Sequence, residues 1–310
     1  MTTMATPAAT LERVTKRFGP TVAVDDVSLE IRRGEMFGLI GPDGAGKTTT
    51  IRLICGLLRA GAGRLTVFGS DPVAQHAAVT RSTGYFSQRF SLYGDLSIDE
   101  NIAFFAEIHG IGDYAARRNR LLDMTQLTPF RDRLADRLSG GMKQKLALAC
   151  TLIHEPQLIL LDEPTTGVDP VSRREFWKLL SEFLAQGITI VMATPYLDEA
   201  ERCSRVGLLS NGKLLIVDTP QALRDSLPGI ILEVLAKPQR DAIEALRTLA
   251  GAADIQSFGE RIHLRCAEGE AAASADRVAQ LLAERDIDVI SIREVPASLE
   301  DVFINRVAVS

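Results

Sequence analysis

One short stretch of the chain brings together the residue types that hold phosphate groups in proteins. It reads, in order, Gly41, Pro42, Asp43, Gly44, Ala45, Gly46, Lys47, Thr48 and Thr49. The spacing is G-x-x-x-x-G-K-T, between an apolar run and a segment able to form a helix. Glycines allow successive backbone N–H groups to face an anion, and the positive end of the following helix attracts it further. With Lys47 for the outer phosphates and the Thr48 hydroxyl for magnesium, the sequence predicts a nucleoside triphosphate site.

Two carboxylates stand at the end of a second apolar run. Asp162 and Glu163 follow residues 158–161, which are typical of a strand buried on both faces of a parallel sheet. Ligands of open α/β sheets lie at the carboxyl ends of such strands. We therefore expect Asp162 to bind magnesium directly or through water, and Glu163 to orient or deprotonate an attacking water. Ordinary surface charge is the alternative, and the phosphate-loop pattern in the same chain argues against it.

A second helix start that could attract an anion lies at Ser139, Gly140 and Gly141. Ser139 suits the N-cap position, and the paired glycines leave backbone amides accessible. An ordinary cap beside a loose turn is the alternative for this stretch taken alone. Phe18 and Gln88 carry weaker signals, since each ends a predicted strand. Phe18 could stack on a base but by itself favours core packing, and a lone glutamine is normally solvated.

Composition limits the classes of protein to which the chain can belong. Its 310 residues are 46% hydrophobic, which suits one large domain with one small one. A net charge of −5 gives no general attraction to nucleic acid. The four cysteines are scattered without a C-x-x-C pair, as expected of reduced core cysteines in a cytoplasm. The apolar runs are too short to span a membrane, so a membrane function would need another chain.

Helix and turn signals divide the chain into an ordered series of elements. Ser97 and Glu100 form a capping-box pattern at the start of a helix, and Asp169 with Pro170 marks another helix start. A short helix is expected at 197–203, followed by a hairpin whose turn is Asn211-Gly212. From residue 228 onward the expected elements are a strand at 230–236, a helix at 240–250, two strands within 255–266, a helix at 272–285 and a strand at 287–294. This β-α-β-β-α-β order predicts a small ferredoxin-like sandwich, with a final helix at 298–307.

Several motifs occur in one order that resembles the ATP-binding subunit of an ABC transporter. They are the phosphate loop, LSGGMKQ at 138–144 and LILLDEP at 158–164, and the resemblance covers roughly residues 11–227. GPDGAGKTT, LYGDLSIDEN and the late SLEDVF at 298–303 are similar to the drug-exporter subclass. The resemblance implies an α/β P-loop NTPase cassette over residues 1–227. Its parts would be a parallel core sheet, antiparallel strands and a helical signature subdomain at about 95–140, with an accessory ferredoxin-like α+β domain at 228–310.

The resemblance also implies roles, cofactors and partners. Phe18 would stack on adenine, and Gln88 would contact magnesium and face a membrane subunit. Ser139, Gly140 and Gly141 would close over ATP held by an opposite subunit, so that two cassettes form a head-to-tail dimer around ATP and Mg2+. The implied partners are integral membrane permease subunits from other chains and a second cassette, with no nucleic acid. The implied location is peripheral, on the cytoplasmic face of the inner membrane.

Pro195 is the most informative departure from the family pattern. The family usually has a switch histidine at this place, while Thr194 and Tyr196 keep the register on either side. Proline has neither a side-chain donor nor a backbone N–H, so it cannot hold the γ-phosphate or the attacking water. We expect this chain's own site to hydrolyse ATP poorly while its signature completes a competent site on a histidine-bearing partner. A heterodimer is therefore favoured over a homodimer; the alternative is that Glu163 suffices and the proline only slows turnover.

Asp43 is a second departure, because asparagine or serine is commoner there. A carboxylate near a triphosphate weakens binding unless it points outward, which is the orientation we expect.

Two other functions are alternatives to an exporter ATPase. A non-transport ABC ATPase is disfavoured by the single cassette, the acidic balance and the lack of a heptad run. An ATP-binding scaffold with negligible hydrolysis is favoured by the missing histidine.

Overall fold

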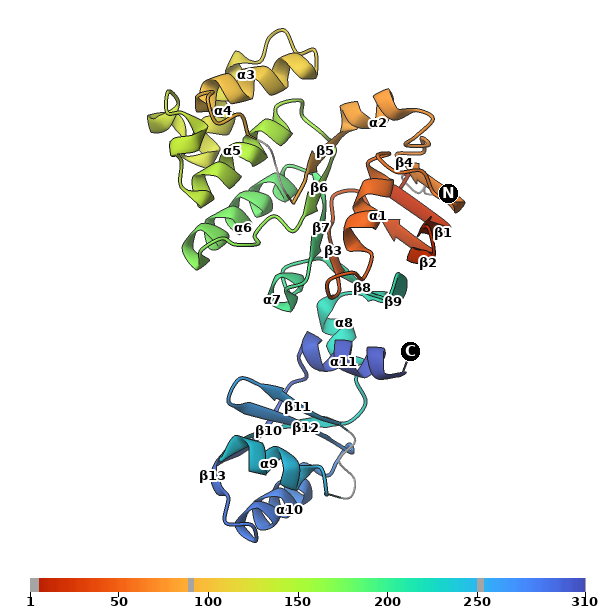
Figure 1. Cartoon of the computed structure of the whole chain (residues 1–310), viewed down its shortest axis with the longest axis vertical. Coiled ribbons are helices and arrows are strands. Elements are labelled where there is room, and N and C mark those ends of the chain that lie inside the picture. The colour runs from red at the N-terminus through yellow and green to blue at the C-terminus, as the bar shows by residue number, and fades with distance from the viewer. Residues whose placement is uncertain (1–5, 89–91, 250–253, 310) are drawn as a thin grey trace. The chain divides into compact units, whose positions relative to one another are not determined.

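The computed structural model describes residues 6–88, 92–249 and 254–309. Two compact units make up the chain, Met1–Val217 and Asp218–Ser310 (Figure 1). The sequence predicts a division after residue 227, and the structure groups α8 (Pro220–Asp225) with the second unit. The physical reason is that α8 packs against α11 (Leu299–Val309), and Arg306 Nη2 donates to Ser226 Oγ just after α8 at 3.5 Å.

A six-stranded sheet forms the centre of the first unit. Its order is β5 (Thr83–Phe86), β6 (Leu158–Asp162), β7 (Thr189–Thr194), β3 (Met36–Ile40), β8 (Arg205–Ser210) and β9 (Lys213–Asp218). The neighbours from β5 through β8 run parallel. Every residue of β3, β6 and β7 is buried, because a parallel strand is covered on both faces. The parallel sheet that the apolar runs predicted is thus confirmed, and β3 and β6 end at the same edge with only β7 between them.

A second sheet of the first unit is antiparallel, in the order β2 (Thr21–Ile31), β1 (Ala9–Phe18) and β4 (Ala62–Val67). One hydrophobic core joins this sheet to α1 (Lys47–Ile54) and to one face of the parallel sheet. Val14, Phe37 and Ile51 represent the three elements in that core, and all are fully buried. The core therefore fixes α1, which begins at the lysine of the phosphate loop, against both sheets. The other helix on this side is α2 (His76–Ser82).

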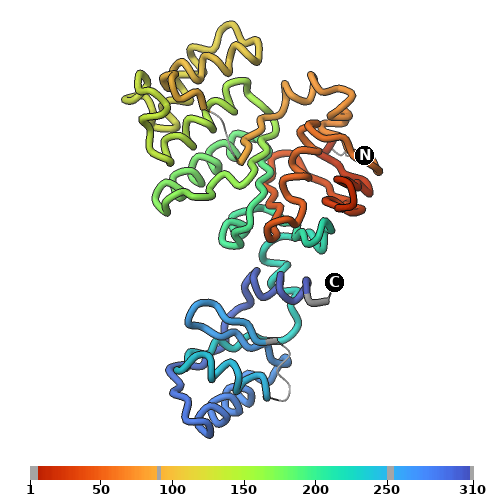
Figure 2. The backbone as a smooth tube through the Cα atoms, in the orientation of Figure 1, coloured from red at the N-terminus to blue at the C-terminus, as the bar shows by residue number. Residues whose placement is uncertain are grey.

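Helices gather to one side of the parallel sheet, coloured yellow to light green in Figure 2. They are α3 (Ile98–Ile108), α4 (Ala115–Thr125), the 3-10 turns η1 (Thr128–Phe130) and η2 (Ala135–Arg137), and α5 (Gly140–Leu152). The predicted capping box is present, since Ser97 Oγ accepts from Glu100 N at 3.2 Å and Glu100 Oε2 accepts from Ser97 N at 2.7 Å. Asp169 likewise caps α6 (Pro170–Ala185).

The second unit has the β-α-β-β-α-β order that the sequence predicted. Its elements are β10 (Ile230–Lys237), α9 (Gln239–Leu246), β11 (Asp254–Phe258), β12 (Arg261–Cys266), α10 (Ala271–Ala283) and β13 (Asp288–Val295). The strands pair antiparallel in the order β11-β12-β10-β13. In this order the first and third strands of the unit lie in the middle, as in a ferredoxin-like sandwich. The apolar side chains of β10 pack in one cluster with those of α9 and α10.

Two helices differ in length from the expectation. The helix expected at 240–250 ends in α9 at Leu246, and residue 250 lies outside the described part of the chain. The helix expected at 197–203 is the single turn α7 (Leu197–Ala200), followed by turns up to the buried Cys203.

The hairpin turn between β8 and β9 agrees with the prediction, since Asn211 and Gly212 both have positive φ. In the described part of the chain, none of the helices has the length and apolar character needed to cross a membrane.

Asn101 fixes the loop that leads into α3. Its side chain is fully buried and donates through Nδ2 to the carbonyl oxygens of Tyr93 (3.0 Å), Leu96 (3.1 Å) and Ser97 (2.9 Å). Its Oδ1 accepts from Tyr93 N at 3.0 Å. One buried amide therefore joins the start of the LYGDLSIDEN stretch to its end, beside the capping box of Ser97 and Glu100.

We expect Asn101→Ala to loosen this loop, because four backbone groups lose their partner. The change should cost about 2 kcal/mol of local stability and speed amide hydrogen exchange across residues 93–97. Hydrogen exchange read by mass spectrometry measures this directly. The matched control is Asn119→Ala on the exposed surface of α4, which should leave the exchange of residues 93–97 unchanged. Equal exchange in both variants would contradict the assigned role of Asn101.

Candidate functional site

The phosphate loop connects β3 to α1 through a backbone that approaches its neighbours closely. Gly44 and Gly46 have φ angles of 79° and 102°, a region that favours glycine. A Cβ on Gly46 would lie 2.3 Å from Ala23 O, and one on Gly41 would lie 2.2 Å from Leu209 O. The positions predicted to cradle an anion are therefore ones where a larger residue does not fit.

Lys47 is held at the centre of this loop. Its side chain is 4% exposed, and Nζ donates to Gly41 O at 2.8 Å and Pro42 O at 3.0 Å. Nζ also lies 3.6 Å from Glu163 Oε1. A buried ammonium is costly without partners, so these three oxygens keep the charge of Lys47 at the loop.

Thr48 and Asp162 meet because β3 and β6 end at the same edge of the sheet. Thr48 Oγ1 donates to Asp162 Oδ1 at 2.8 Å, and Tyr85 Oη donates to Asp162 Oδ2 at 3.5 Å. Burial raises the pKa of Asp162, and the hydrogen bond from Thr48 with the charge of Arg52 opposes that rise. In the described part of the chain, no cluster of three or more His, Cys, Asp or Glu forms a metal site. One hydroxyl and one carboxylate nevertheless suit magnesium, which keeps waters and phosphate oxygens as its other ligands.

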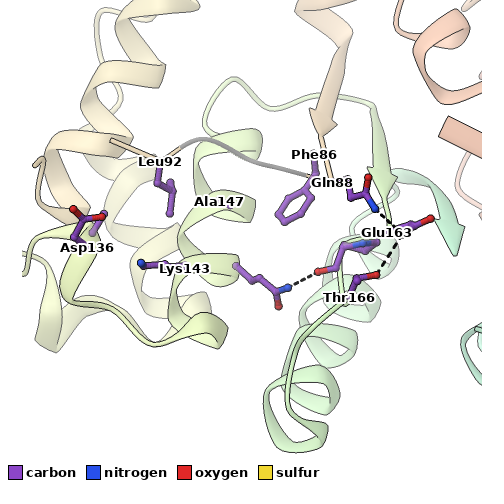
Figure 3. A pocket seen from close by; sticks show the side chains of 11 residues that line it. Phe86, Gln88, Leu92, Asp136, Lys143, Ala147, Glu163 and Thr166 are labelled. Atoms are coloured by element: carbon purple, nitrogen blue, oxygen red, sulfur yellow. Dashed lines mark hydrogen bonds between the residues drawn. The ribbon is translucent and has the colours of Figure 1, made fainter. Parts of the chain in front are cut away.

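Glu163 links the phosphate loop to Gln88, which lies in the turn two residues after the end of β5 at Phe86. Glu163 Oε2 accepts from Gln88 Nε2 at 2.9 Å and from Thr166 Oγ1 at 3.5 Å (Figure 3). The other carboxylate oxygen, Oε1, lies 3.6 Å from Lys47 Nζ. The glutamate is 11% exposed and has a φ of 50°, in the left-handed region. Gln88 is thus a donor to the carboxylate that we expect to act on water, where its sequence position alone suggested a solvated amide.

The remaining predicted residues lie apart from this cluster. Phe18 is 47% exposed, with Lys16 Nζ 5.2 Å from its ring centroid, so the core packing that its position favoured is wrong. Asp43 is exposed to solvent, and its orientation away from the phosphates stays a prediction. Ser139 caps α5 by accepting from Met142 N at 3.3 Å, and a Cβ on Gly140 would meet open space.

Among the described residues, no hydrogen bond or ion pair joins the signature helix start to the phosphate loop. Pro195 follows β7 and is half-buried, with Thr194 Oγ1 accepting from Tyr196 N beside it at 3.0 Å.

Three contacts of the site were missed by sequence reasoning. They are the hydrogen bond of Tyr85 to Asp162, that of Thr166 to Glu163, and that of Gln144 Nε2 to Pro164 O at 2.6 Å. Each residue lies within or beside a motif, but the motif pattern indicates phosphate and metal ligands only. Two of the three could have been marked as candidate site residues from their positions. Tyr85 lies three residues before Gln88, and Gln144 is the last residue of the LSGGMKQ motif.

Comparison with known proteins adds independent findings. A protein-family model described as ABC transporter matches residues 24–166. The chain is 46% identical over 226 residues to "Probable multidrug ABC transporter ATP-binding protein YbhF" of Escherichia coli (strain K12), covering 71% of this chain and 39% of that protein. It is 33% identical over 304 residues to the daunorubicin resistance ATP-binding protein DrrA2 of Streptomyces coeruleorubidus, covering 96% of this chain and 94% of that protein. The chain therefore spans less than half the length of the Escherichia coli relative.

Solved structures that resemble this chain are also ATP-binding cassettes. A solved dimeric ATP-binding cassette in a post-hydrolysis state, bound to ADP and Pi, superposes with a TM-score of 0.61 at 26% identity. The match covers 68% of this chain and 98% of that one. An ATP-binding subunit of an ABC transporter superposes with a TM-score of 0.64 at 29% identity, covering 70% of this chain and 92% of that one.

Asp43 provides a direct test of the loop geometry. Because its carboxylate is exposed to solvent, Asp43→Asn should change the affinity for ATP by less than about twofold at physiological salt. Equilibrium binding of a fluorescent ATP analogue measures the effect. Lys47→Ala serves as the positive control, and its affinity should fall well below that of either protein. A tenfold tighter Asp43→Asn variant would show that the carboxylate faces the phosphates.

Proposed function

The chain belongs to the ATP-binding proteins of ABC transporters, and from that premise we propose that it binds ATP with magnesium to drive an exporter. The observation that carries the proposal is the meeting of Lys47, Glu163 and Gln88 at one sheet edge, beside the Thr48 and Asp162 pair. Export of a drug-like molecule is supported by relatives named for multidrug transport and daunorubicin resistance, and by the SLEDVF segment.

ATP is held by groups that the fold places in advance. When ATP binds, Lys47 leaves Gly41 O, Pro42 O and Glu163 and contacts the outer phosphate oxygens instead. At the other end of the nucleotide, the exposed ring of Phe18 stacks on the adenine. Thr48 and Asp162 are the residues that would hold magnesium, which supplies charge neutralisation on the phosphate oxygens when bound. Glu163 orients the attacking water and takes its proton, and Gln88 holds the carboxylate through the 2.9 Å hydrogen bond.

The signature helix start serves a second subunit in this proposal. Ser139 and Gly140 are exposed at the N-terminus of α5, where backbone N–H groups and the helix dipole favour an anion. They would close over the ATP of a second cassette, and a cassette of the same fold has been solved as a dimer with ADP and Pi. Permease subunits in other chains would form the membrane path, with this chain peripheral on the cytoplasmic face of the inner membrane.

Pro195 supports an asymmetric pair of sites. The described residues include no histidine in contact with the Lys47 and Glu163 cluster. His76 contacts Pro72 O, His109 stacks on His154, and His263 contacts Asp301 in the second unit. Hydrolysis at this chain's own phosphate loop is therefore slow, and a histidine-bearing second cassette supplies the faster site. The same observation favours one further candidate, a chain that binds ATP as a scaffold with negligible turnover of its own.

Replacing one glutamate at a time in the assembled transporter distinguishes the contributions of the two sites to ATP hydrolysis. We expect Glu163→Gln to leave most of the ATP hydrolysis, while the equivalent change in the second cassette lowers it by about a hundredfold or more. Single-turnover hydrolysis on a rapid-quench instrument gives the measurement. If Glu163→Gln abolished hydrolysis and the change in the second cassette were harmless, the asymmetric assignment would be wrong.

Restoring the missing imidazole tests the role of Pro195. Pro195→His should raise single-turnover hydrolysis at this chain's site by about tenfold or more, because a donor is placed at the γ-phosphate. The control is Pro195→Ala, which restores the backbone N–H without an imidazole and should gain little. A Pro195→His variant no faster than Pro195→Ala would show that the histidine position does not limit turnover here.

A further inference from the structure

Gln144 joins the signature helix to the turn that carries Glu163. It lies in the second turn of α5, and its Nε2 donates to Pro164 O at 2.6 Å, the bond drawn in Figure 3. Pro164 directly follows Glu163. Among the hydrogen bonds of the described residues, this is the one that connects α5 to residues 163–166. The helix start proposed to act on the partner's nucleotide is thus bonded to the turn that senses this chain's own nucleotide.

The turn at 163–166 is positioned from three sides. Glu163 N donates to Ala193 O in β7 at 2.9 Å, and Thr165 Oγ1 donates to the buried Glu199 of α7. Gln144 supplies the third contact, from α5. Because Glu163 has a φ of 50°, in the left-handed region that is unfavourable for residues other than glycine, the turn depends on these neighbours for its shape.

Side-chain packing does not fill the space between α5 and the turn at 163–166 beside the Gln144 bond. A cavity of about 390 Å3 lies beside it, with Glu163 and Thr166 on one side and Asp136 and Lys143 on the other (Figure 3). The lining side chains of the two sides are therefore separated by open space along this cavity. The bond crosses this gap, so a displacement of the Glu163 turn reaches α5 through the Gln144 side chain.

The chemistry at this position requires an amide. A carbonyl oxygen only accepts hydrogen bonds, so the –NH2 end of Gln144 must face Pro164. Gln144 Oε1 is buried without a hydrogen-bond partner, a cost that is tolerated while the donor end is engaged. A glutamate has the same shape but would present only acceptors to Pro164 O.

We propose that Gln144 is a positioning residue that couples ATP at this chain's phosphate loop to the signature helix start on the same chain. ATP changes the partners of Lys47 and Glu163, the turn at 163–166 moves with Glu163, and Gln144 transfers that movement to α5. The signature then presents Ser139 correctly to the partner's nucleotide. This inference rests on the proposed function, and it gives the slow site a role: its ATP controls hydrolysis at the other site.

The fold itself does not need Gln144, so variants at this position are informative. α5 is tied to α6 by the ion pair of Lys145 Nζ with Glu175 Oε2 at 2.6 Å, and Leu146 and Leu148 are fully buried. Gln144→Glu and the uncharged Gln144→Met should both melt within about 5 °C of the unchanged protein, as expected when one hydrogen bond is lost in a unit of this size. Gln126→Glu, at an exposed position after α4, is the matched control for the added charge.

The test is a double-mutant cycle with Lys47→Ala in the assembled transporter, reading kcat and KM of hydrolysis at the partner site. Gln144→Glu and Gln144→Met should each lower kcat about tenfold, leave KM within about twofold, and have no further effect once Lys47→Ala has removed ATP from this chain's loop. Gln126→Glu should behave as the unchanged protein. A kcat within twofold of the unchanged protein, or an effect of Gln144 that multiplies with that of Lys47→Ala, would overturn the coupling role. The proposed function is judged separately, by whether hydrolysis in the unchanged assembly depends on the partner's glutamate.

Discussion

The parallel pairing of β3 with β7 and of β7 with β6 is the constraint on which the site depends. Parallel strands present their carboxyl ends at one edge, so the loop after β3 and the carboxylates that end β6 meet there although they are far apart in sequence. The 2.8 Å hydrogen bond from Thr48 to Asp162 is the direct result. Complete burial of β3, β6 and β7 keeps that edge in place, and α1 is fixed by the same hydrophobic core.

Charge at this edge is balanced by groups that ATP would displace. The Lys47 ammonium donates to two carbonyl oxygens and is paired with the Glu163 carboxylate, and Glu163 accepts in turn from Gln88. In the proposed function, a triphosphate would replace the contacts of Lys47 and free Glu163 to act on water. The nucleotide and the Glu163 turn would then be linked by charge, and the turn is linked to α5 by the hydrogen bond of Gln144. We propose that this series of contacts allows one chain to take part in two composite sites.

Local patterns in the sequence predicted much of the fold and of the nucleotide site. The capping box at Ser97, the cap at Asp169 and the turn at Asn211-Gly212 each depend on neighbouring residues only, and each is confirmed by the structure. The buried strands follow from continuous apolar runs in the same way. Contacts that depend on how helices pack against the sheet, such as the hydrogen bond of Gln144 to Pro164, could not be predicted. Phe18 shows the same limit: it is the last residue of β1, beyond the part of the strand where Leu11 and Val14 are buried, and alternation along a strand does not reveal where the core ends.

The central claim is that ATP lies between this chain and a second cassette, and a distance measurement tests it most directly. All four cysteines are buried, so a spin label on Arg137→Cys, beside the signature start and exposed, can be introduced selectively. A second label goes next to the phosphate loop of the partner cassette. With ATP and magnesium the two labels should give one short, narrow distance, and without nucleotide a longer and broader distribution. Identical distributions with and without ATP, with the signature start open to solvent throughout turnover, would contradict the composite site.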